Sequence, residues 1–95
     1  MINIKEAFAQ FDDEYMEFER IKNPLSSRPD LCAFILLDKL CPGNSDIISA
    51  SEHDEFYLSI DIEELAKVAT QEDILTLNRC GVRYDSQYDC LCMFA

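Results

Sequence analysis

Apolar residues along this chain of 95 residues recur first at the spacing of a helix and later at the spacing of a strand. Near the start they stand four or three residues apart, as on one side of an amphipathic helix: Ile4, Phe8, Phe11, Tyr15 and Phe18. Further on, Phe56, Leu58 and Ile60 alternate with more polar residues, as in a half-buried strand. The chain therefore has to build its core from helices and a sheet together.

Two helices are predicted in the first half of the chain. Asn3 begins a capping-box pattern, so the first helix is expected to start there and to run to about Lys22. For the second helix, Ser27 is the candidate N-cap and Pro29 suits the first turn. Residues 31–37 are apolar nearly all round, which predicts that this helix is the most buried one.

Strands and short helices are predicted in the second half. Asp61 and Thr70 are expected to cap two helices, and Gly81 is expected to end the second of them. The predicted elements are strands at 47–50 and 56–60, helices at 62–68 and 71–80, and a terminal hairpin of 82–84 and 88–94. The order ααββααββ predicts one α+β domain over residues 1–95, a four-stranded antiparallel sheet with helices mainly on one face.

The net charge limits the partners of this domain. It carries 19 acidic and 8 basic residues, a formal charge of −11, while 48% of its residues are hydrophobic. That composition is typical of a folded, soluble protein and not of a disordered acidic tail. Direct binding of DNA, RNA or an anionic membrane needs a basic surface, so these ligands are not expected. A basic protein surface is the expected partner.

The cysteines and the N-terminal residues indicate a reducing compartment. The five cysteines are an odd number without a Cys-x-x-Cys spacing, which is typical of free thiols in a cytoplasm. No secretory signal is expected from the first residues, which begin directly with the amphipathic pattern. A cytoplasmic location is therefore predicted, that of a bacterial host if the chain is encoded by a phage.

No reaction is indicated by the sequence. With only two glycines it has no phosphate-binding loop, and it has no Gly-x-Ser-x-Gly motif. The single histidine, His53, stands in an acidic stretch that is typical of an exposed turn. We therefore predict that the protein is not an enzyme and has no cofactor. An alternative is a zinc-binding protein whose ligands would be four thiolates: Cys41, Cys80, Cys90 and Cys92.

Carboxylates are the candidate binding groups. They are concentrated in residues 12–19 and again in residues 52–73. On a continuous helix, Asp13 and Glu17 would stand about 6 Å apart along the axis. That spacing is of the same order as the roughly 3.4 Å between successive phosphates on a DNA strand. The residues predicted to contact a basic partner are Asp12, Asp13, Glu17, Glu63 and Glu64.

A compact acidic chain with carboxylates at 12–19 and 52–73 resembles small phage-encoded inhibitors of bacterial defence. Anti-CRISPR and anti-restriction proteins belong to that group, and some of them occupy nucleic-acid sites by presenting carboxylates. The resemblance implies an inhibitor whose acidic surface blocks the basic, nucleic-acid-binding groove of a host defence protein.

Assembly of several copies is the alternative function. In the terminal hairpin, Leu91 and Met93 lie on one side of the strand and Cys90, Cys92 and Phe94 on the other. Since both sides are apolar, one side could pack on the helices while the other meets a second copy. Leu91 and Met93 are the residues predicted for the interface of such a homodimer.

Overall fold

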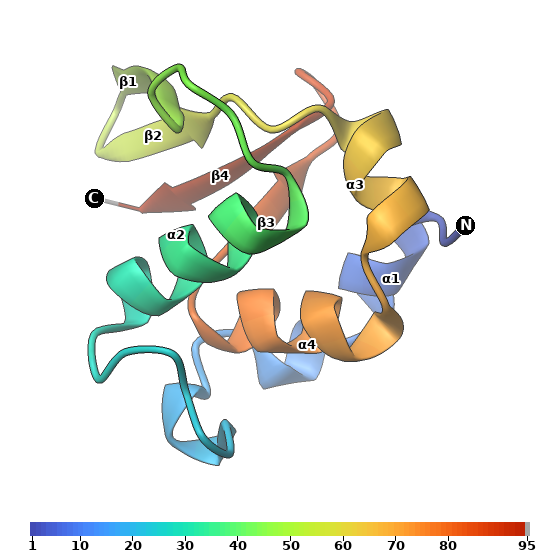
Figure 1. Cartoon of the computed structure of the whole chain (residues 1–95), viewed down its shortest axis with the longest axis vertical. Helices are drawn as coiled ribbons and strands as arrows, with labels where there is room; N and C mark the ends of the chain where they lie inside the picture. Colours follow the sequence, from blue (N-terminus) through green and yellow to red (C-terminus); the bar gives the residue numbers. More distant parts are fainter. Residues whose placement is uncertain (95) are drawn as a thin grey trace.

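The computed structural model describes residues 1–94 as four α-helices, two short 3₁₀ helices and a four-stranded sheet (Figure 1). The predicted α+β class and the order ααββααββ are confirmed. In chain order the elements are α1 (Ile4–Gln10), η1 (Asp12–Glu14), η2 (Phe18–Arg20), α2 (Pro29–Leu40), β1 (Ile48–Glu52), β2 (Glu55–Leu58), α3 (Ile62–Val68), α4 (Gln71–Arg79), β3 (Arg83–Asp85) and β4 (Cys90–Phe94).

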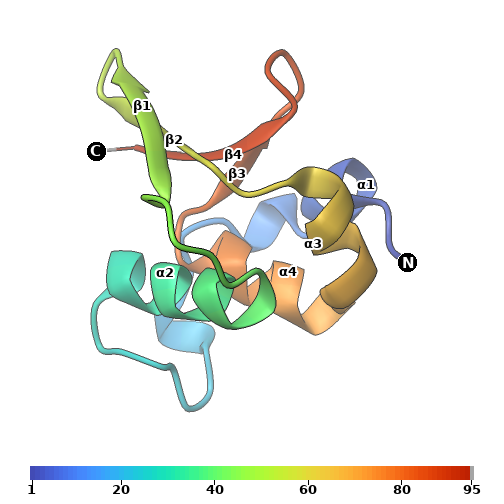
Figure 2. The same cartoon turned by 45° about the horizontal axis from the view of Figure 1, so that its top comes forward.

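The sheet is antiparallel throughout, with the strand order β1-β2-β4-β3. The two hairpins lie side by side, because β2 pairs with β4 through the register Leu58↔Leu91 and Phe56↔Met93. Figure 2 shows the helices on one side of this sheet, as predicted. The opposite side, which we call the helix-free face, is covered by no helix among residues 1–94.

The hairpin of β1 and β2 turns within two residues, His53 and Asp54, both of which have positive φ angles. Two left-handed residues give the turn a twist that matches the twist of the flanking strands. The strand predicted at 47–50 therefore reaches two residues further than expected, because Ser51 and Glu52 belong to β1. His53 is exposed in this turn, as expected.

The first helix is much shorter than predicted. It ends at Gln10 instead of Lys22, and the chain then folds back through η1 and η2, with a positive φ of 63° at Met16. One reason is electrostatic, because the carboxylates of Asp12–Glu14 follow the C-terminal end of α1, where negative charge is unfavourable within the helix. The other is packing, since the folded-back segment places Phe18 and further apolar side chains against the core.

The second helix starts close to the predicted place. Pro29 occupies its first turn as expected, but Arg28 and not Ser27 is the N-cap, and no side chain caps it. Cys32, Ala33 and Leu37 are buried, whereas Leu31 is 44% exposed. This helix therefore has one outward side, although its sequence is apolar nearly all round.

The caps predicted for the last two helices are confirmed. The Asp61 carboxylate accepts hydrogen bonds from the first turn of α3, and Thr70 and Asp73 form a reciprocal capping box at α4. Gly81 ends α4 with a φ of 97°, and the Val82 N–H donates to the Leu77 carbonyl in a Schellman motif. The core between helices and sheet contains the fully buried side chains Leu37, Leu58, Leu65, Ile74, Leu77, Val82 and Leu91.

Candidate functional site

The predicted contact residues form two separate groups on the surface. Asp12 and Asp13 are exposed on η1, and Glu17 lies at the start of η2; both elements pack against α4. Glu63 and Glu64 are exposed in the first turn of α3, on another part of the molecule (Figure 1). Because the first helix ends early, Asp13 and Glu17 are not one turn apart on a helix. The single row of carboxylates predicted from the sequence is therefore wrong.

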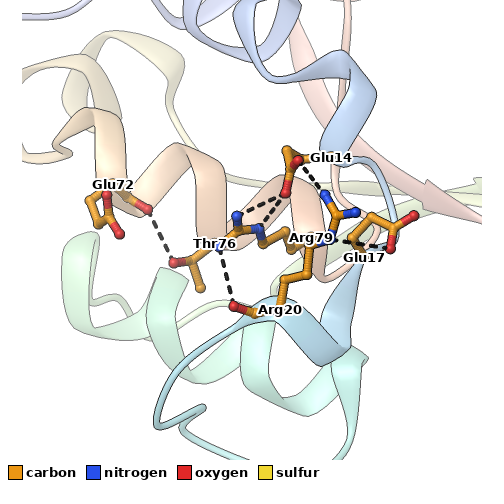
Figure 3. Close-up of polar contacts among 6 residues, drawn as sticks. All are labelled: Glu14, Glu17, Arg20, Glu72, Thr76 and Arg79. Carbon is orange, nitrogen blue, oxygen red and sulfur yellow. Dashed lines mark hydrogen bonds and ion pairs between the residues drawn. The ribbon is translucent and has the colours of Figure 1, made fainter.

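Two arginines bind Glu14 and Glu17 in this part of the chain, as Figure 3 shows. Arg79 of α4 contacts the Glu14 carboxylate through Nη2 at 2.8 Å and through Nε at 2.9 Å. Arg20 contacts the second oxygen of the same carboxylate at 2.6 Å and lies 3.8 Å from Glu17. Arg79 also donates to the Arg20 carbonyl, so this network connects the segment of residues 14–20 to α4.

Neighbouring side chains shift the pKa values of Glu14 and Glu17 in opposite directions. The hydrogen bond from Arg79 is the main cause that lowers the pKa of Glu14 from its usual 4.5. The hydrogen bond with Glu19 is the main cause that raises the pKa of Glu17, followed by the charge of Glu19. Since Glu14 is 17% exposed and satisfied by two arginines, we assign this network a structural role, namely holding η1 and η2 on the core.

The network predicts a pH-dependent loss of stability. Because the pKa of Glu14 is lowered on folding, its ionised form stabilises the folded state above pH 4.5, and this contribution disappears as the pH falls below that value. Glu14→Gln should therefore lower the urea midpoint at pH 7 more than at pH 3. The control is Glu72→Gln, an exposed carboxylate on α4, which should shift the midpoint little at either pH. Equal losses for Glu14→Gln at both pH values would contradict this role.

A second acidic feature is a cleft of about 330 Å³ between the end of α2, the loop before β1 and the start of α3. Three carboxylates line it, those of Asp38, Asp61 and Glu64, and we call it the acidic cleft. Between the carboxylates the lining is mainly apolar: Leu40, Cys41, Pro42, Ile47, Ile60 and Val68. An apolar pocket with a carboxylate rim has the composition expected of a site for a long basic side chain.

The electrostatic environment of the acidic cleft is negative. Burial first, and then the charges of Glu64 and Asp61, raise the pKa of the Cys41 thiol at the end of α2. The last carbonyl groups of α2 add partial negative charge here, because a helix C-terminus lacks intrahelical donors. One cation compensates in part, since Lys67 lies 3.3 Å from Glu64, but this pair is exposed and weak.

Hydrogen bonds of the backbone and of the Ser59 and Asp61 side chains hold the walls of the acidic cleft. The Ser59 N–H donates to the Ile47 carbonyl at 2.6 Å, and the Ser59 hydroxyl donates to the Asp46 carbonyl at 2.5 Å. On the other wall, Asp61 accepts from the N–H groups of Glu63 and Glu64 at 2.9 and 3.2 Å. The carboxylates of Asp61 and Glu64 therefore sit on a helix start whose position is set by its cap.

The four cysteines proposed as zinc ligands do not converge. Cys80 is buried beside Cys32, and burial is the main cause that raises the pKa of Cys80 to about 12. Cys41 lines the acidic cleft, and Cys90 lies on the helix-free face. Within residues 1–94 no group of three or more histidine, cysteine or acidic side chains is placed to hold a metal ion. A shared site of Cys41, Cys80, Cys90 and Cys92 is therefore contradicted by the fold.

The residues predicted for a dimer interface belong to the core. Leu91 is fully buried and Met93 is 5% exposed, because this side of β4 faces the helices. On the helix-free face, Arg83 forms an ion pair with Glu55 and stacks 4.2 Å above the Phe94 ring, which is 56% exposed. An interface on this sheet would therefore involve the Cys90 and Phe94 side of β4, not Leu91 and Met93.

Sequence reasoning named Glu63 and Glu64 but missed Asp38. Asp38 is an isolated acidic residue on α2, and only the approach of α3 to the end of α2 places it near Glu64. Its signal in the sequence is a polar residue directly after the apolar run of residues 31–37.

Comparison with known proteins gives no relative for this fold and site: no family model, no curated protein and no solved structure matches the chain. None of the helices within residues 1–94 has the length and apolar character that crossing a bilayer requires.

Proposed function

We propose that this chain is a non-enzymatic interaction module that binds a basic segment of another protein at its acidic cleft. The observation that carries this proposal is the arrangement of Asp38, Asp61 and Glu64 around an apolar pocket. The partner that we propose is a nucleic-acid-handling host protein whose basic groove the chain blocks, since the acidic character resembles that of phage-encoded anti-defence inhibitors.

The chemistry of the acidic cleft supports a lysine or arginine as the group bound there. Both side chains have an aliphatic stem that suits the apolar lining and a cationic head that suits the carboxylates. Glu63 lies next to Glu64 on the exposed side of α3 and extends the negative rim. Asp12, Asp13 and Glu17 lie elsewhere on the surface, where they add to the field that attracts a basic partner.

The net charge of −11 supports the same partner through the kinetics of association. Opposite fields accelerate the encounter of two proteins by about tenfold to a thousandfold at low salt. Ions screen this attraction over about 10 Å at 0.1 M ionic strength. A basic partner should consequently be captured best at low salt.

The proposal is tested with the full chain immobilised in a bacterial lysate and washed at two salt concentrations. Proteins retained only at low salt are identified by mass spectrometry, and the partner is purified. Its association rate constant should fall by about tenfold or more from low to moderate salt, and the chain should compete with DNA or RNA for the partner. A rate that stays flat with salt would contradict the electrostatic mechanism, and an absence of competition would contradict the blocked groove.

A further inference from the structure

Strand β1 forms an open edge of the sheet. All five of its residues, Ile48–Glu52, are exposed, and within residues 1–94 its outer edge pairs with no other strand (Figures 1 and 2). The opposite edge differs, because β3 has only three half-buried residues and packs beside α1. Within residues 1–94 the open edge is therefore the longer and more exposed of the two edges of the sheet.

The open edge carries only part of the protection that usually prevents strand addition, namely a register irregularity with β2 between Ile48 and Ala50. Edge strands are commonly protected by proline, lysine or an inward-pointing charge. β1 contains neither proline nor lysine, and Glu52 is its only charged residue. Ile48 is 45% exposed at its start. From Ala50 to Glu52, where the pairing with β2 is regular, a partner strand would meet few obstacles.

The register identifies the backbone groups that point outward. Glu52 and Glu55 close the two-residue turn, so they form a hydrogen-bonded pair, and the next pair, Ser51↔Phe56, is of the non-hydrogen-bonded kind. The N–H and carbonyl of Ser51 therefore point away from β2 towards the open edge. They are available to a strand that pairs with β1.

A hollow on the helix-free face adjoins this edge. It has a volume of about 370 Å³ and is lined by Ser49, Ala50, Glu52, Tyr57, Tyr88 and Cys90; we call it the tyrosine hollow. The rings of Tyr57 and Tyr88 meet edge to face, with their centroids 5.6 Å apart, and Tyr88 is 58% exposed. Two aromatic rings beside a carboxylate form a favourable environment for a cation.

The tyrosine hollow and the acidic cleft lie along the same hairpin. Ile47, the residue before β1, lines the acidic cleft, whereas Ser49, Ala50 and Glu52 line the tyrosine hollow. A partner segment that pairs with the open edge would therefore pass the tyrosine hollow. The residues that follow this segment in the partner would reach the rim of the acidic cleft.

We propose that the open edge of β1 accepts an extended, lysine- or arginine-bearing segment of the partner as a fifth strand. One basic side chain of that segment lies over Tyr57 and Tyr88 beside Glu52. This inference rests on the proposed function, because it takes the partner to be basic. It specifies the partner segment as a strand that gains affinity from backbone hydrogen bonds and selectivity from every second side chain.

Charge complementarity decides between the occupants of the edge. A second copy of this chain would bring another net charge of −11 and a second Glu52 against the same edge. Like charges placed together oppose association, whereas a basic segment is attracted. The occupant is consequently a basic strand from another protein and not a second copy.

The test uses a short synthetic peptide that alternates lysine with threonine, with blocked ends, titrated into the full chain and followed by NMR. The variant Ser51→Pro removes the outward N–H without removing a bond between β1 and β2. Its matched control, Ser51→Ala, keeps that N–H. Two further probes are versions of the same peptide in which every second amide is N-methylated. In one version the methyl groups block one edge of the extended peptide, and in the other version they block the opposite edge.

We expect the lysine peptide to protect the Ser51 N–H from exchange and to shift the ring signals of Tyr57 and Tyr88. Ser51→Pro should weaken binding by about tenfold, the loss expected for a main-chain hydrogen bond, whereas Ser51→Ala should leave it nearly unchanged. Methylation of the peptide edge that faces β1 should also weaken binding by about tenfold, whereas methylation of the opposite edge should not. Tyr88→Ala should weaken binding by a few-fold, through the lost contact with the cation.

Other results would overturn the inference. If the peptide binds equally well with either edge methylated, or fails to bind at low salt, no strand is added at β1. If a glutamate–threonine peptide binds as well as the lysine peptide, the proposed basic partner is wrong as well. If the chain sediments as a dimer that Ser51→Pro dissociates, a second copy occupies the edge. If the double variant Asp38→Asn, Glu64→Gln loses binding of the peptide while Ser51→Pro keeps it, the acidic cleft binds the peptide and no strand is added at β1. The proposed function would then stand without the added strand.

Discussion

Reversing two charges of the acidic cleft, by Asp38→Lys together with Glu64→Lys, is expected to lower partner affinity by about a hundredfold or more. Each substitution replaces an attraction with a repulsion next to a bound cation, and like charges placed together at an interface cost several kcal/mol. Both residues are exposed, so the fold should be preserved. Asp61 is left unchanged, because its carboxylate caps α3 and its removal would disturb that helix.

The matched control for this experiment is Asp12→Lys together with Asp13→Lys. It makes the same change in net charge at two exposed positions of η1 that the sequence predicted as contacts. If the acidic cleft holds the basic side chain, this control should mainly reduce the association rate, by a few-fold. Affinities measured by calorimetry that fall equally for both double variants would show that the overall field, and not the cleft, determines binding.

Replacing Leu91 with alanine is expected to lower the free energy of unfolding by about 2–5 kcal/mol. Leu91 is fully buried on β4, between Leu58 of β2 and Tyr84 of β3, so its truncation leaves a cavity between sheet and helices. Such a loss is large against a total stability of about 5–15 kcal/mol for a domain. Urea denaturation of purified protein measures it directly.

The comparison variant for Leu91 is Phe94→Ala on the opposite side of the same strand. Phe94 is 56% exposed and stacks on Arg83, so its removal should cost clearly less stability than that of Leu91. Sedimentation of both variants completes the experiment. If Leu91→Ala dissociated an oligomer while the unfolding free energy stayed unchanged, the assignment of Leu91 to the core would be wrong.

Local chemistry made much of this fold predictable. Caps such as Thr70 with Asp73, and the positive φ of Gly81, depend on residues three or fewer positions apart, so their patterns are legible in the sequence. The alternation of Phe56 and Leu58 likewise depends only on the pleat of a strand, although β2 ends at Leu58 and not at Ile60 as predicted. Where a local pattern met a competing long-range contact, the prediction was wrong. The first helix ends at Gln10, and Arg79, 65 residues after Glu14, binds the folded-back segment to α4.

The candidate site was predictable only in part. Glu63 and Glu64 were identified as binding residues from their place in an acidic stretch, but Asp38 was not, since nothing near it in the sequence is acidic. The acidic cleft forms where the start of α3 lies near the end of α2 and the loop before β1. The Ser59 hydroxyl holds this loop by donating to the Asp46 carbonyl. Tyr57 and Tyr88 meet for a similar reason, as the two hairpins lie side by side in the sheet.

By itself, the sequence determined the α+β class, the order of the elements, most helix caps and the acidic character of the surface. These properties depend on composition and on contacts between near neighbours, which the order of the residues specifies directly. Only the tertiary structure decided which carboxylates are neutralised by arginines, which line a cleft, and which side of β4 faces the core. Each of these depends on pairs of residues far apart in the chain, brought together by packing that no local pattern records.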